Sequence, residues 1–108
     1  MLQLRRFCFS MTAYMFQFEL PEMTDEMAAK IPAQRTRVAE LFSDGKLLTY
    51  SLAQSRRALW CVVTAEDEQE ALELVASFPL HPFFTDVMCQ PLMFHNTVAS
   101  TLPDISLN

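Results

Sequence analysis

The chain has 108 residues and a net charge of −5, from 13 acidic and 8 basic residues, and 51% of its residues are hydrophobic. This length suits one small domain, and the composition indicates a globular chain. The basic residues form no stripe that would neutralise phosphates, so the composition argues against a nucleic-acid partner. A chain this short buries only about 60–70% of the surface that it exposes when unfolded. The surplus of apolar residues therefore predicts a partner subunit.

The three cysteines, Cys8, Cys61 and Cys89, have no CxxC spacing and no histidine pair near them. An odd count without that spacing argues against a disulfide framework and against a zinc site. The single glycine leaves no glycine-rich phosphate loop. We therefore expect a cytoplasmic protein without a metal or a cofactor. No apolar run reaches the length of a membrane span and no cleavage site follows the apolar N-terminal run, so we expect neither a membrane partner nor a signal peptide.

The first predicted strand covers residues 13–20 and ends at Pro21, because its side chains alternate strictly between two faces. One face carries Tyr14, Phe16, Phe18 and Leu20, and the other carries Met15, Gln17 and Glu19. Residues 1–12 precede this pattern, and we expect them to form an N-terminal extension that is a candidate for disorder.

A helix is predicted for residues 24–45. Thr24 is a candidate N-cap, and Gly45 stands where a helix C-cap favours the left-handed conformation. Pro32 removes a backbone hydrogen bond and clashes with the preceding turn, so we expect the helix to kink or to restart near Ile31. The side chains that we expect to face the core are those of Met27, Ile31, Val38, Leu41 and Phe42.

Two further strands are predicted at residues 46–53 and 57–65, joined by a short polar turn. The second is apolar on both faces, with Leu59, Cys61 and Val63 on one side and Ala58, Trp60 and Val62 on the other. A strand with one face in water would show polar residues there. We therefore expect both faces of this strand to be covered.

A second helix is predicted for residues 64–78, with Thr64 as its cap. Its inward side chains are expected to be Ala71, Leu72, Val75 and Phe78. The last strand is predicted at residues 86–95, and Pro91 within it cannot donate to a ladder, so we expect an edge strand or a bulge. The tail, residues 97–108, carries several aliphatic residues, and we expect it to dock on a neighbouring subunit.

The predicted order β-α-β-β-α-β is that of a ferredoxin-like α+β domain, which we place at residues 13–96. Both helices would pack on one face of the sheet. The other face carries enough apolar residues to need a second sheet, so we expect a homodimer or a larger ring.

Several segments of the chain resemble the muconolactone isomerase family, whose members are dimeric α+β barrels of ferredoxin-like subunits. They are MFQFELP in the first strand, LFSDG at the end of the first helix, FPLHPFF after the second helix, and DVMCQPLMFH, which ends at His95. The resemblance implies cofactor-free isomerisation of a small unsaturated lactone that carries a carboxylate, as in aromatic-compound degradation. A proton would leave one carbon and return at another, through a dienolate.

Such a reaction needs a base, a donor to the developing oxyanion and a cation for the carboxylate. The candidate bases are His95 and Glu19, and the candidate donors are Tyr50 and Gln17. The candidate cations are Arg35 and Arg56, and Trp60 is a further candidate for substrate binding.

Each candidate also has a purely structural interpretation. His95 would be a strand-end imidazole bonded to backbone, Glu19 an exposed edge residue, and Arg35 a partner of Glu40 or Asp44. Tyr50 and Trp60 would be core or interface aromatics, and Arg56 a solvated turn residue.

Two other functions remain open. Gln17 and Glu19 stand where members of the family carry basic residues, which favours a non-catalytic ligand-binding or assembly module with the same fold. The second alternative is a cofactor-free relative of the monooxygenase kind.

Overall fold

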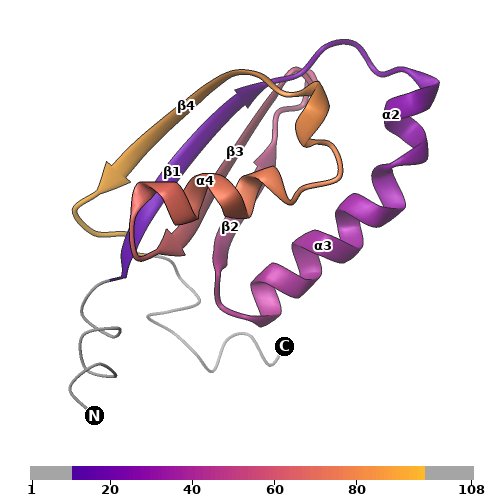
Figure 1. Ribbon diagram of the computed structural model, residues 1–108. Helices are drawn as coiled ribbons and strands as arrows, with labels where there is room; N and C mark the ends of the chain where they lie inside the picture. The colour runs from indigo at the N-terminus through magenta and orange to yellow at the C-terminus, as the bar shows by residue number, and fades with distance from the viewer. Residues whose placement is uncertain (1–10, 97–108) are drawn as a thin grey trace.

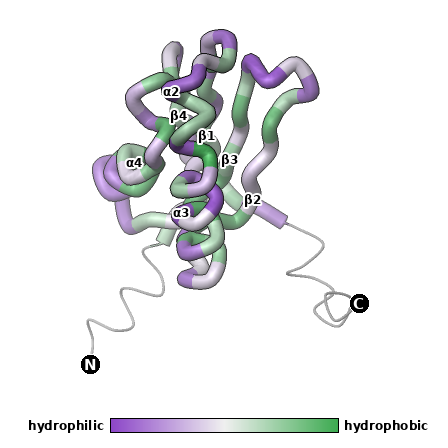
Figure 2. The backbone as a smooth tube through the Cα atoms, turned by 90° about the vertical axis from the view of Figure 1, so that its right-hand side faces the viewer, coloured by the Kyte–Doolittle hydropathy of each residue, from purple (hydrophilic) through white to green (hydrophobic). Residues whose placement is uncertain are grey.

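The computed structural model describes residues 11–96. The expectations for most of the N-terminal extension and for the tail lie outside this range. The elements run in the order β1 (Thr12–Glu19), α2 (Asp25–Ala29), α3 (Ile31–Ser43), β2 (Leu47–Leu52), β3 (Ala58–Ala65), α4 (Glu68–Ala76), the 3-10 helix η1 (His81–Phe83) and β4 (Thr85–Leu92). The strands form one antiparallel sheet in the order β2-β3-β1-β4. Figures 1 and 2 show α3 and α4 on the same side of this sheet, which confirms the ferredoxin-like arrangement.

The core lies between this side of the sheet and the helices. The predicted inner face of β1 is confirmed, since Tyr14, Phe16, Phe18 and Leu20 are all buried. β4 is an edge strand, as Pro91 predicted. Its pairing with β1 is irregular between Gln17 and Glu19, and Asp86 adopts a φ of 50° beside that bulge. No helix within residues 11–96 is both long and apolar enough to cross a membrane.

The first predicted helix is divided in two, as Pro32 predicted. The hydroxyl of Thr24 accepts a hydrogen bond from Met27 N at 3.2 Å and caps α2. α3 then starts at Ile31, with Pro32 in its first turn. The glycine at its end, Gly45, has a φ of 74°, in the left-handed region that favours glycine.

The inward stripe of α3 differs from the prediction at one residue. Phe42 is 43% exposed, whereas Leu41 is buried and Val38 packs against the core. The restart fixes the rotation of the new helix, so that residues 34, 38 and 41 share the inner side. Gln34 therefore takes a core position that we had not assigned, and Phe42 is turned out.

The cap predicted for the second helix is wrong. Thr64 still belongs to β3, where its N–H donates to the carbonyl of Lys46 at 3.0 Å. The cap of α4 is Asp67, whose Oδ1 accepts a hydrogen bond from Glu70 N at 2.8 Å. Leu72 is exposed rather than inward, because the buried line of α4 runs through residues 71, 75 and 78.

The two faces of β3 are covered unequally. Leu59, Cys61 and Val63 are buried under the helices, as predicted. On the opposite face Val62 is buried, but Trp60 is 38% exposed. The expectation that both faces are covered is therefore met only in part within a single chain.

Candidate functional site

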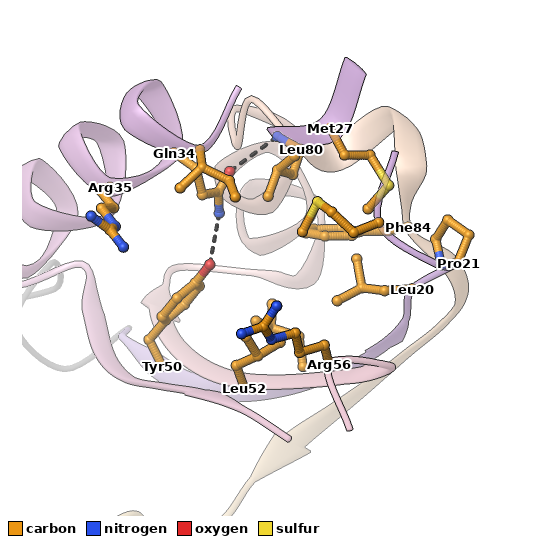
Figure 3. A pocket seen from close by; sticks show the side chains of 13 residues that line it. Leu20, Pro21, Met27, Gln34, Arg35, Tyr50, Leu52, Arg56, Leu80 and Phe84 are labelled. Carbon is orange, nitrogen blue, oxygen red and sulfur yellow. Dashed lines mark hydrogen bonds between the residues drawn. The ribbon is translucent and has the colours of Figure 1, made fainter. Parts of the chain in front are cut away.

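A cavity of about 350 Å³ opens between α2 and α3 on one side and the β2–β3 hairpin on the other (Figure 3). This volume is at the lower end of the range typical of small-molecule sites, about 300–1,000 Å³. Most of its lining is apolar, and includes Leu20, Met23, Met27, Ile31, Leu59 and Phe84. Its polar lining consists of Gln34, Arg35, Tyr50 and Arg56. The cavity therefore combines an apolar body with a few polar groups, as ligand sites do.

The break before α3 shapes one wall of this cavity. Met27 comes from α2, and Gln34 and Arg35 come from the first turns of α3. Arg35, one of the two candidate cations for a carboxylate, therefore lines the cavity. Its structural alternative, an ion pair with Glu40, is formed instead by Arg37, with Nη1 3.1 Å from Oε1.

The hairpin forms the opposite wall. Arg56 adopts a φ of 65° in the turn, which is rare for a residue with a Cβ, and its N–H donates to the carbonyl of Ala53 at 2.8 Å. The guanidinium of Arg57 donates to the carbonyl of Leu20 at 2.7 Å and ties the turn to the end of β1. Figure 3 shows Arg56 and Arg35 coming from opposite walls. Both are exposed, so they stand at the mouth of the cavity.

Tyr50 and Gln34 form the polar part of the interior. Gln34 is only 3% exposed, and its Nε2 donates to Tyr50 Oη at 2.9 Å. Its Oε1 accepts from Leu80 N at 3.0 Å, so one amide joins α3, β2 and the segment before η1. The ring of Tyr50 packs edge-on against Phe78. Burial raises the pKa of the Tyr50 hydroxyl, and the hydrogen bond from Gln34 offsets part of that rise. Tyr50 is therefore a neutral donor near pH 7.

Gln34 is the residue that sequence reasoning missed. It lies on the same helical line as Val38 and Leu41, at the spacing i, i+4 and i+7. The signal that could have identified it is a single polar residue on the apolar stripe of a helix that starts at a proline. Without the exact start of α3, that line was not distinguishable from the one through Phe42.

The other predicted site residues do not line the cavity. Gln17 pairs with Trp60 in β3 and with Met88 in β4, on the face of the sheet that the helices do not cover. Glu19 lies at the end of the same strand and is exposed. His95 follows β4, and its Nε2 is buried without a hydrogen-bond partner among the described residues. The structure thus gathers Tyr50, Arg35 and Arg56 and separates them from the other four.

This separation matters for the chemistry of the cavity. No histidine, aspartate or glutamate of the described part of the chain is among the lining residues. The side chain of His81 packs edge-on against Phe84, with ring centroids 6.0 Å apart, without lining the cavity. Within residues 11–96, the lining thus supplies a neutral donor and two cations, but no base.

The element order and the helices on one face define a subunit of the dimeric α+β barrel class. Solved structures of similar fold include a 5-chloro-2-hydroxyhydroquinone dehydrochlorinase, TftG, from Burkholderia phenoliruptrix AC1100 in complex with 2,5-dihydroxybenzoquinone. It aligns with a TM-score of 0.55 and 11% identity, over 78% of this chain and 95% of its own. MtbAldR aligns with a TM-score of 0.52 and 13% identity, over 81% of this chain and 56% of its own. At these identities the likeness shows the fold alone.

The sequence profile of the muconolactone delta-isomerase family matches residues 11–97. The chain therefore belongs to the muconolactone delta-isomerase family. A search of curated protein sequences found no significant match.

Proposed function

We propose that the protein is an isomerase-like member of this family, which binds a small unsaturated lactone carrying a carboxylate and shifts a proton in it without a cofactor. The observation that carries the proposal is the lining of the cavity, where the neutral hydroxyl of Tyr50 and two guanidinium groups face a small apolar space. The degradation of aromatic compounds is the metabolic setting that the family suggests.

In this proposal the carboxylate of the substrate lies at the mouth, where Arg35 and Arg56 offer charge-assisted hydrogen bonds. The lactone ring enters the apolar interior with its carbonyl oxygen toward Tyr50. A base removes a proton from one ring carbon, and the electron pair of that C–H bond is delocalised onto the carbonyl oxygen. Tyr50 stabilises the resulting dienolate by hydrogen bonding. A proton then returns at the other carbon, so the product is an isomer and nothing is oxidised.

The base in this proposal comes from outside the described residues that line the cavity. His95 and Glu19 are the candidate bases, and the reaction requires that a second copy of the chain, or a rearrangement on substrate binding, bring one of them to the cavity. The proposed homo-oligomer is supported by the uncovered sheet face, where Trp60 is 38% exposed and Met88 is 62% exposed.

A second candidate function is a binding module that holds such a carboxylate without converting it. The specific observation in its favour is the lack of an imidazole or carboxylate among the described residues that line the cavity. Binding without turnover would be the signature of this function.

An ultraviolet assay with muconolactone tests the proposal. The wild type would be compared with Tyr50→Phe and His95→Ala, each first checked for unchanged oligomer size. Turnover by the wild type is expected. With His95 as the base, His95→Ala should lose about a hundredfold or more in rate, since acid–base groups contribute about 10² to 10⁴. Binding without turnover by any of them would instead establish the binding module.

A further inference from the structure

We infer that Gln34 is a positioning residue that fixes the direction of the Tyr50 hydroxyl proton, so that the cavity accepts ligands presenting a hydrogen-bond acceptor at Tyr50 and disfavours those without one. This inference deepens the proposed function, and its ligand-selection part rests on it. The direction of the hydrogen bond itself depends only on the chain.

One partner of the Gln34 side chain is a backbone N–H group, which can only donate a hydrogen bond. Leu80 N–H is a donor and lies 3.0 Å from the amide of Gln34. Only the oxygen of a glutamine amide accepts hydrogen bonds, so Oε1 must face Leu80. The orientation of the amide is therefore fixed by the main chain of a different segment, the turn that precedes η1.

The orientation of the Gln34 amide decides which group donates at Tyr50 Oη. With Oε1 on Leu80, the Nε2 group faces Tyr50 Oη at 2.9 Å and has only protons to offer. Tyr50 Oη must therefore accept this hydrogen bond, and its own proton points elsewhere. No other partner of this hydroxyl is found within residues 11–96. Since Tyr50 lines the cavity (Figure 3), the proton is available to an acceptor of a bound ligand.

Burial makes this arrangement persistent. Gln34 is 3% exposed, so water does not compete for its amide. Reversing the amide would place its NH₂ group against Leu80 N–H and leave two buried donors facing each other. An unpaired buried donor is unfavourable, which disfavours the reversed amide. A hydroxyl that already accepts from an amide also donates more strongly. The result is a donor whose direction is set before the ligand arrives.

The first test measures the hydrogen-bond direction without a ligand. A donor at Oη stabilises the tyrosinate, so Gln34→Met, which removes it, should raise the pKa of Tyr50, and Gln34→Glu should raise it further because a carboxylate there stabilises the protonated hydroxyl. Absorbance titration of the tyrosinate band gives this pKa after subtraction of the Tyr50→Phe spectrum, which removes the signal of Tyr14. A lowered pKa in Gln34→Met would overturn the inference, because it would mean that Tyr50 donates to Gln34.

The second test measures ligand choice. The probes are a saturated γ-lactone bearing an acetate group, which cannot isomerise, and the matched cyclic ether that lacks the ring carbonyl. The wild type should prefer the lactone by about tenfold, the effect of one good hydrogen bond. Tyr50→Phe should abolish the preference, and Gln34→Glu should abolish or invert it, because the new carboxylate draws the hydroxyl proton away from the cavity.

Thermal unfolding of the two Gln34 variants separates positioning from simple stabilisation. Gln34→Glu still accepts from Leu80 N and should unfold nearer the wild type, whereas Gln34→Met leaves that N–H unpaired and should unfold earlier. A positioning role predicts that the more stable variant has the poorer lactone preference. If preference instead followed stability across the two variants, the inference would be wrong. If the pKa changes are as expected but neither probe binds the wild type, the hydrogen-bond direction stands and the proposed substrate class fails.

Discussion

Trp60 of β3 lies directly opposite Gln17 of β1, on the face of the sheet that carries no helix. The row continues to Ser51 in β2 and to Met88 in β4. In the single chain, the side chains of Trp60 and Met88 in this row are exposed. Apolar exposure in the middle of a sheet face is typical of an interface.

We therefore expect Trp60→Glu to separate the proposed homo-oligomer, because the introduced charge would have to be buried without a partner between two sheets. Light scattering on the eluted protein should give at least twice the chain mass for the wild type and the mass of one chain for the variant. Leu72→Glu is the matched control, since Leu72 is exposed on α4. A wild type that is monomeric at all concentrations would contradict this prediction.

Arg35→Gln should weaken binding of the saturated lactone acetate by about tenfold at low salt, since it removes a charge-assisted hydrogen bond at an exposed mouth. The loss should shrink at high salt, where exposed charges are screened. Titration calorimetry would compare this variant with Arg37→Gln, whose guanidinium binds Glu40 and Ser77 instead of lining the cavity. Equal losses in the two variants would show that the effect is one of overall charge.

Asp67→Ala should lower the free energy of unfolding by about 1 kcal/mol, the usual effect of removing an N-cap. Asp67→Asn keeps an oxygen that accepts from Glu70 N and should cost much less. Urea unfolding of both variants and of Thr64→Ala would locate the cap. A larger loss for Thr64→Ala than for Asp67→Ala would place the start of the helix where the sequence analysis predicted it.

Cys61 should resist alkylation in the folded protein at about pH 8. Burial raises the pKa of its thiol to about 12, so only about one molecule in 10⁴ carries the reactive thiolate at that pH. Cys89 is only half-buried and should react before Cys61, as peptide mass spectrometry after timed alkylation would show. Modification of both at the same rate would mean that the core around β3 opens freely.

The same raised pKa has a consequence for stability. The folded thiol keeps its proton up to about pH 12, whereas the unfolded thiol loses it near its ordinary pKa of about 8.5. The contribution of Cys61 to stability is therefore complete below about pH 8.5 and is lost as the pH rises toward 12. The free energy of unfolding should fall less steeply across this window in Cys61→Ala than in the wild type.

The fold was predictable because its signals are local. Alternation in β1, the proline at position 32 and the glycine at position 45 each act within a few residues, and the structure bears out all of them. The errors arose where two elements compete for one residue. Thr64 has the side chain of a helix cap, but pairing of β3 with β1 and the hydrogen bond to Lys46 keep it in the strand.

The candidate site was predictable only in part. Arg35 and Tyr50 were candidates because of their residue types. The role of Gln34 depends on contacts with Tyr50 and Leu80, residues 16 and 46 positions away along the chain. No short window of sequence contains both partners. The placement of Gln17 and Trp60 away from the cavity likewise follows from which face of the sheet the helices cover, which is a property of the whole domain.

Whether the cavity under α3 is the ligand site can be tested by titrating isotope-labelled protein with the saturated lactone acetate and recording amide and side-chain correlation spectra. Saturable shifts are expected for the Gln34 side-chain amide, the Leu80 amide and the Arg35 guanidinium, with the Trp60 indole and the Gln17 side chain unchanged. Shifts confined to Trp60 and Gln17 would contradict this assignment and move the site to the opposite face of the sheet.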